Sequence, residues 1–290
     1  MNDIILVLGM HRSGTSSVTG ILARLGCALP ESLMSPAADN PTGFFESFKI
    51  VEFSDALLEA AGSNWRDWRP INPAWYSSHS AAEFRLRAQR LLRQEFNGSP
   101  LSVFKDPRAC RCLPFWLDVL GDMKIRPHVV MPIRFPLDAA QSLTRRNGLS
   151  STHGLRLWLR HVLDAEANSR GITRTVFAWE HFLSDWQMVC DNIASDAKLS
   201  WPRLYSNACH DIEKFLDYKL VHHKTERSIL TAEVEGGDWA LRAYQALLSL
   251  ASNASRDLAT LDEIRAQFDQ FSRTSEPLAA LGPDRADRRL

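Results

Sequence analysis

Four short, predominantly apolar runs recur along the first two thirds of the chain. They are Ile4–Leu8, Leu101–Phe104, Val129–Ile133 and Thr175–Ala178. Runs of this length, bounded by polar or turn-forming residues, are typical of strands buried on both faces of a sheet. We therefore predict four strands in the interior of the molecule.

Helical patterns separate these runs. Val18, Ile21, Leu22 and Leu25 fall on one face of a helix predicted over 15–25, and Gly26 suits its C-terminal cap. Further helices are predicted over 47–61, 80–96 (with Ser80 and Glu83 as a capping box), 136–147, 152–169, 179–197, 238–252 and 257–271.

This alternation of strands and helices indicates a three-layer α/β fold with a central parallel β-sheet flanked by helices. Residues 1–272 contain neither an internal repeat nor a linker, so one domain is expected there. Residues 273–290 are rich in Pro, Gly, Ala and Arg and are expected to form a flexible C-terminal tail.

Composition narrows the possible partners and compartments. The 290 residues include 34 Lys and Arg against 34 Asp and Glu, which gives no general case for binding nucleic acid or an anionic membrane. No apolar run approaches the roughly 18 residues of a membrane span, and no signal peptide is evident, so a cytoplasmic location is expected. Five irregularly spaced cysteines predict neither a disulfide framework nor a metal site.

The segment Gly9–Ser16 follows the first predicted strand and opens the first predicted helix. Backbone N–H groups in such a loop point inward and bind anionic oxygens. Gly9, Gly14 and Ser16 match the nucleotide triphosphatase pattern GxxxxGK[ST], but Thr15 stands where the lysine belongs. A cation, Arg12, lies instead within the loop, which favours a 5′-phosphate carrying one further group and bound without a metal.

The loop, with its sequence GMHRSGTS, resembles that of sulfotransferases that use 3′-phosphoadenosine-5′-phosphosulfate (PAPS), especially bacterial, carbohydrate-sulfotransferase-like members. The resemblance implies a P-loop-type fold without ATP chemistry, and PAPS as co-substrate with no metal. The loop residues that would bind it are His11, Arg12, Ser13, Gly14, Thr15 and Ser16.

A second motif points to the same donor. Arg134 ends the third predicted strand and Ser142 follows eight residues later, matching the 3′-phosphate motif of that family. Arginine binds phosphate with a bidentate fork, and the serine hydroxyl adds a directional donor. Alternatively, Arg134 caps the sheet edge and Ser142 lies on a solvated helix, and neither binds phosphate. Lys224, in a basic segment, matches the family loosely as a further cofactor-binding residue or belongs to a solvated charge cluster.

Sulfuryl transfer needs a base for the acceptor hydroxyl and cations for the charge on the transferred group. Arg12 is one cation, and Lys105, which follows the second predicted strand, is the other candidate. Glu46 lies in a segment that resembles N-P-x-G-[FY]-[FW]-E of bacterial members, where a glutamate serves as base in several carbohydrate sulfotransferases. Glu46 is thus the predicted base, with Asp106 and His11 as alternatives.

The acceptor is less well specified than the donor. Four aromatic residues between Trp65 and Tyr76 suit stacking on a sugar or, alternatively, packing in the core. The expected partner is a hydroxyl-bearing glycan or small molecule. Two other functions remain open: a P-loop kinase-like transferase that takes its lysine from elsewhere, and a non-catalytic protein that binds PAPS or its product.

Overall fold

The computed structural model describes residues 2–37, 40–216, 236–252 and 258–274. Its strands are β1 (Asp3–Val7), β2 (Leu101–Lys105), β3 (Arg126–Ile133) and β4 (Arg174–Ala178). Its helices are α1 (Thr15–Arg24), α2 (Phe48–Ala60), α3 (His79–Phe96), α4 (Leu113–Asp122), α5 (Pro136–Asn147), α6 (Ser151–Asn168), α7 (Trp179–Ser184), α8 (Trp186–Ala197), α9 (Tyr205–Phe215), α11 (Gly237–Ala251) and α12 (Ala259–Thr274), with 3-10 turns η1 (Pro73–Ser77) and η2 (Pro107–Cys110).

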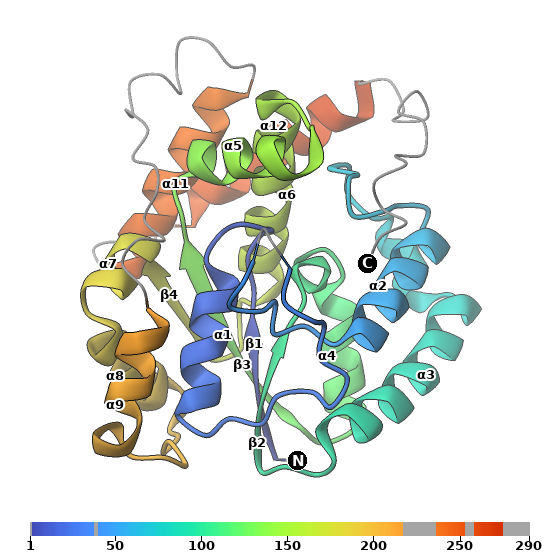
Figure 1. Ribbon diagram of the computed structural model, residues 1–290. Coiled ribbons are helices and arrows are strands. Elements are labelled where there is room, and N and C mark those ends of the chain that lie inside the picture. The colour runs from blue at the N-terminus through green and yellow to red at the C-terminus, as the bar shows by residue number, and fades with distance from the viewer. Residues whose placement is uncertain (1, 38–39, 217–235, 253–257, 275–290) are drawn as a thin grey trace.

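The four strands form one parallel sheet in the order β2-β1-β3-β4 (Figure 1). Val7 of β1 is in register with Lys105 of β2 and with Val130 of β3. Helices cover both faces, so the predicted three-layer α/β fold is confirmed. Because all strands run the same way, the segments that follow them meet at one edge of the sheet.

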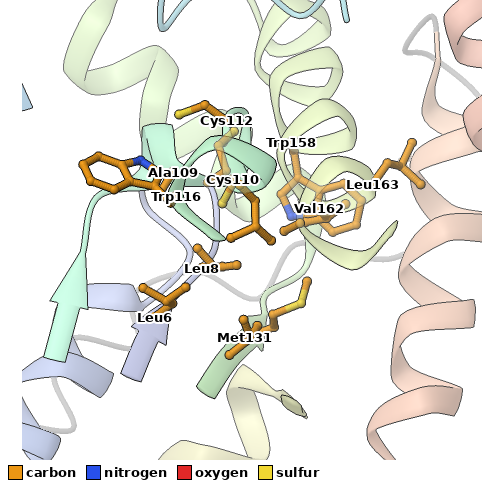
Figure 2. Packing of buried hydrophobic residues seen from close by; sticks show 14 of the residues in the cluster. Leu6, Leu8, Ala109, Cys110, Cys112, Trp116, Met131, Trp158, Val162 and Leu163 are labelled. Atoms are coloured by element: carbon orange, nitrogen blue, oxygen red, sulfur yellow. The ribbon is translucent and has the colours of Figure 1, made fainter. Parts of the chain in front are cut away.

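Alternation along β1 divides the core in two. Ile5 and Val7 face a cluster built with α1, α7, α8 and α9, whereas Ile4 and Leu6 face the larger cluster on the other side. Figure 2 shows part of the larger cluster, to which Leu6 of β1, Trp116 of α4 and Trp158 of α6 belong. Both indoles are at most 1% exposed. Both faces of the sheet are therefore packed, which fixes the position of its C-terminal edge.

Local structure departs from the sequence prediction in three places. Helix α3 begins at His79, and Ser78 rather than Ser80 caps it, because the turn η1 ends there and Ser78 Oγ accepts a hydrogen bond from Ala81 N at 3.1 Å. The helix predicted after β4 is two helices, since Asp185 ends α7 and caps α8. Helix α4 was not predicted at all, and α9 lies in a stretch for which no helix bounds were predicted.

The C-terminal helices lie close to their predicted positions. Helix α12 continues to Thr274, two residues past the predicted domain end, and the single domain over 1–272 stays a prediction. Within the described ranges, no helix is long and apolar enough to cross a membrane.

Candidate functional site

The loop between β1 and α1 has the backbone that anion binding requires. Arg12 and Gly14 both have left-handed φ angles, of 69° and 85°. Left-handed residues between right-handed ones turn successive N–H groups to the same side, and the start of α1 adds its unpaired N–H groups. Glycine is needed at position 14 for a second reason, because a Cβ there would overlap the ring of Trp179.

A cavity of about 140 Å³ opens above this loop at the C-terminal edge of the sheet. Eight predicted site residues line it: His11, Arg12, Gly14, Thr15, Ser16, Glu46, Lys105 and Arg134. Ser13 is buried beneath them, and its hydroxyl has no hydrogen-bond partner among the described residues. A larger hollow of about 470 Å³ lies along β4, and none of the predicted site residues line it. The candidate site is therefore the smaller cavity above the loop.

Lys105 and Glu46 form an ion pair at the wall of this cavity. Lys105 Nζ contacts Glu46 Oε1 and also donates to Phe44 O at 2.9 Å and to Ser16 Oγ at 3.1 Å. The two side chains are only 4% and 7% exposed. The segment that carries Glu46 is thereby bound to both the end of β2 and the start of α1.

Behind this pair lie the buried side chains of Arg108 and Asp106, together with the half-exposed Asp55. Arg108 donates two hydrogen bonds to Asp55, at 2.5 and 3.2 Å, and one to Asp106 at 3.2 Å. Its Nη1 is 4.0 Å from Glu46 Oε2. Burial lowers the pKa of Arg108, but Asp106 and Asp55 outweigh it and raise that pKa. Burial also raises the pKa of Asp106, which does not line the cavity and so has no direct path to an acceptor.

The two predicted phosphate motifs are in contact with each other. Arg134 follows β3, and its Nη1 donates to the backbone carbonyl of Arg12 at 2.8 Å. Arg12 Nε in turn donates to Ser142 Oγ at 2.8 Å. Burial lowers the pKa of Arg134, with opposition from Asp138 and Glu180. The loop and the Arg134–Ser142 pair thus belong to one site, whereas Lys224 lies outside the described residues.

Three of the cavity residues that were not predicted as site residues contribute to the shape or charge of the site. Trp179 directly follows β4, and its place after a strand end was a signal that could have found it. Arg146 lies one helical turn after Ser142, with its guanidinium carbon 5.9 Å from the centroid of the Phe44 ring. Asn40 Nδ2 donates to Gly43 O at 2.7 Å and shapes the loop that carries Glu46.

The aromatic segment divides between core and cavity. Trp68 is 4% exposed and stacks on Phe268 and Phe271, so it packs in the core and is not available to a ligand. Trp65 is partly buried and contacts His11, which itself lines the cavity. No group of three or more His, Cys, Asp or Glu side chains in the described part of the chain is arranged to hold a metal ion.

Comparisons with known proteins found distantly similar solved structures. No protein-family model and no curated protein matches the sequence. The sulfotransferase domain of the Synechococcus PCC 7002 olefin synthase is 15% identical with a TM-score of 0.44, covering 95% of this chain and 96% of that one. The sulfotransferase domain from the curacin biosynthetic pathway is 13% identical with a TM-score of 0.41, covering 92% and 97%. Likenesses this distant do not identify an activity.

Proposed function

We propose that this protein transfers a sulfuryl group from PAPS to the hydroxyl of an acceptor. The observation that carries the proposal is the contact between the loop and the second phosphate motif, made by Arg12 with Ser142 and by Arg134 with the Arg12 carbonyl. PAPS has a 5′-phosphosulfate and a 3′-phosphate, and the site offers one group of donors for each. ATP lacks the 3′-phosphate, and the loop lacks the lysine that ATP chemistry requires.

The residues present suit such a donor. The loop N–H groups and the unpartnered, buried Ser13 hydroxyl would bind the oxygens of the 5′ group. Arg134 and Ser142 would bind the 3′-phosphate. Arg12 and Lys105 would then exchange their present partners for the phosphosulfate, where their charges stabilise the transferred group and the leaving phosphate. Trp179 supplies an aromatic wall on which an adenine ring could stack.

The sequence predicts Glu46 as the base, with His11 among the alternatives. Glu46 lies on the cavity wall beside Lys105, close to where the transferred group would be. If it takes the acceptor proton, Glu46→Gln should lower turnover without abolishing PAPS binding. Normal turnover of that variant would show that the assignment is wrong. A carbohydrate acceptor also stays a prediction, to be tested with a panel of glycans and small alcohols.

Calorimetry on the full chain tests the donor. We expect adenosine 3′,5′-bisphosphate (PAP) to bind, and ATP with Mg²⁺ not to bind. Arg134→Ala should weaken PAP binding by about 1.5–3 kcal/mol, the value of a charge-assisted hydrogen bond, and Ser142→Ala should weaken it less. Arg90→Ala, an exposed arginine on α3, is the matched control and should bind as the wild type does.

Two outcomes would redirect the proposal. Magnesium-dependent binding of ATP would contradict it and favour a kinase-like transferase. Selective PAP binding without transfer of labelled sulfate to any acceptor would favour a non-catalytic binding protein.

A further inference from the structure

Two histidines lie close together behind the anion-binding loop. His11 comes from the loop and lines the cavity, and His161 comes from the middle of α6 and is 1% exposed. Their ring centroids are 6.5 Å apart with the planes at 66°, and Trp65 packs edge-on against His11 at 5.4 Å. The pair of rings therefore runs from the cavity, at His11, into the core, at His161.

The hydrogen bonding of His161 determines its tautomer. Its Nδ1 is 2.7 Å from Leu157 O, and because a carbonyl only accepts, Nδ1 must carry the hydrogen. The pKa of His161 is lowered to about 3, mainly by burial and then by the charge of Arg111, so the ring is neutral at pH 7. Its Nε2 is consequently a bare lone pair, buried and without a partner among the described residues.

His11 also has a nitrogen that lacks a hydrogen-bond partner among the described residues. Its Nε2 is also buried and unpartnered within the described part of the chain. Rings joined by a direct N–H···N bond of about 3 Å have closer centroids than these two, but the spacing suits one water with a bond of about 2.9 Å to each nitrogen.

Such a water would orient His11. A water that donates to the His161 lone pair can accept from His11 Nε2, which then carries the hydrogen of the neutral ring. The lone pair of His11 would therefore be on Nδ1, at the ring edge left to face the cavity.

Glu46 is less suited to take a proton in this arrangement. Its Oε1 accepts from Lys105, and its Oε2 faces Arg108 at 4.0 Å. Both carboxylate oxygens of Glu46 therefore already face cations, whereas His11 forms no ion pair with any described residue.

We propose that His11, oriented by His161 through one bridging water, is the base that accepts the acceptor's hydroxyl proton. This inference rests on the proposed function. The acceptor oxygen forms a bond to sulfur while the bond from sulfur to the 5′-phosphate oxygen breaks, and PAP leaves with that electron pair. The hydroxyl proton goes to His11 Nδ1 and from there to solvent. His161 is a positioning residue in this scheme, since it acts only through His11.

Donor binding would strengthen this base. The pKa of His11 is well below its usual value, because the ring is buried and because Arg108 of η2, Arg146 of α5, His161 of α6 and Lys105 of β2 surround it. The anionic donor would neutralise much of this positive charge, and a nearby anion raises the pKa of a histidine. His11 would then become a competent proton acceptor once the donor has bound.

Nuclear magnetic resonance on the full chain, with ¹⁵N-labelled histidine, tests the arrangement without any acceptor. We expect Nδ1–H at His161, Nε2–H at His11, and a rise in the pKa of His11 when PAP is added. His161→Phe should disturb the His11 tautomer, whereas His161→Gln, whose amide oxygen can accept from the water, should preserve it. A His11 ring that carries hydrogen on Nδ1, or whose pKa PAP does not raise, would overturn the proposal.

Kinetics supply the second test. His11→Gln should lower kcat by about 10²–10⁴-fold and remove the acidic limb of the pH–rate profile. Glu46→Gln should keep that limb, and His79→Gln, with a side chain 90% exposed, is the control. An acidic limb that persists in His11→Gln would refute the base assignment. Absence of PAP binding to the wild type would instead refute the proposed function.

Discussion

The buried ion pair between Lys105 and Glu46 allows a direct energetic test of the site. Lys105→Met removes the closest positive charge from a carboxylate whose side chain is 7% exposed. Removing one partner of a buried pair costs about 3–5 kcal/mol, because the other charge stays buried without compensation. Arg108 at 4.0 Å compensates only in part, so we expect a loss within this range.

Glu46→Gln should cost less than Lys105→Met. The lysine keeps two acceptors, Phe44 O at 2.9 Å and Ser16 Oγ at 3.1 Å, so its charge remains hydrogen-bonded. In the double variant neither charge is left unpaired by the loss of the other. Its cost should therefore fall short of the sum of the single costs by about 1–3 kcal/mol.

Urea unfolding followed by circular dichroism measures these free energies. Lys105→Met should also lower Tm by roughly 10 °C, from about 2–4 °C per kcal/mol for chains of this size. Lys214→Met, an exposed lysine on α9, is the control and should change stability by no more than about 0.5 kcal/mol. Single costs that simply add in the double variant would refute the coupling and with it the buried contact.

Three further predictions follow from particular residues. Gly14→Ala should destabilise the fold and abolish PAP binding in calorimetry, since φ is 85° and a Cβ would overlap Trp179. Gly62→Ala, with φ of 73° and open space around it, is the control and should show only the backbone cost of about 1–2 kcal/mol. Equal losses of stability in the two variants would contradict the Trp179 contact. The pKa of His161 is about 3 in the folded chain, so below about pH 6.5 the unfolded chain binds a proton that the folded chain does not. Urea unfolding should therefore show the free energy of unfolding falling by about 2 kcal/mol between pH 6.5 and 5, and falling less in His161→Phe. The same pH dependence in the variant as in the wild type would exclude His161 as its cause. Ellman's reagent should titrate one thiol rapidly in the native protein, that of half-buried Cys209, and all five after unfolding, because the other four are buried; rapid reaction of a second thiol would contradict that burial.

The predictions that succeeded are those that depend on local pattern. The run Ile4–Leu8, the glycines of the loop and the apolar face of the first helix all lie within about 20 residues of one another. Parallel strands and the edge at which their following segments meet then placed Arg134 beside the loop. Capping was harder: Ser78 and Ser80 are equally good N-cap residues, and only the end of the η1 turn selects Ser78.

Predictions about roles depended on contacts that the sequence does not contain. Glu46 was assigned by resemblance, and nothing in the sequence showed that Lys105 would pair with it from 59 residues away. The helix that carries His161 was predicted over 152–169, but nothing in the sequence indicates a chemical role for this histidine. Trp179 likewise reads as one more apolar residue after a strand.

The sequence by itself determined an α/β chain with a glycine loop at the start of its first helix, because a strand, a glycine turn and a helix start are consecutive along the backbone. The tertiary structure decided which side chains share that loop's surroundings. Parallel packing brought Lys105 and Arg134 to one edge, and the docking of α6 placed His161 behind His11. Side-chain charge and hydrogen bonding act over a few ångströms, so the partners of each group were determined only when segments more than 50 residues apart had packed together.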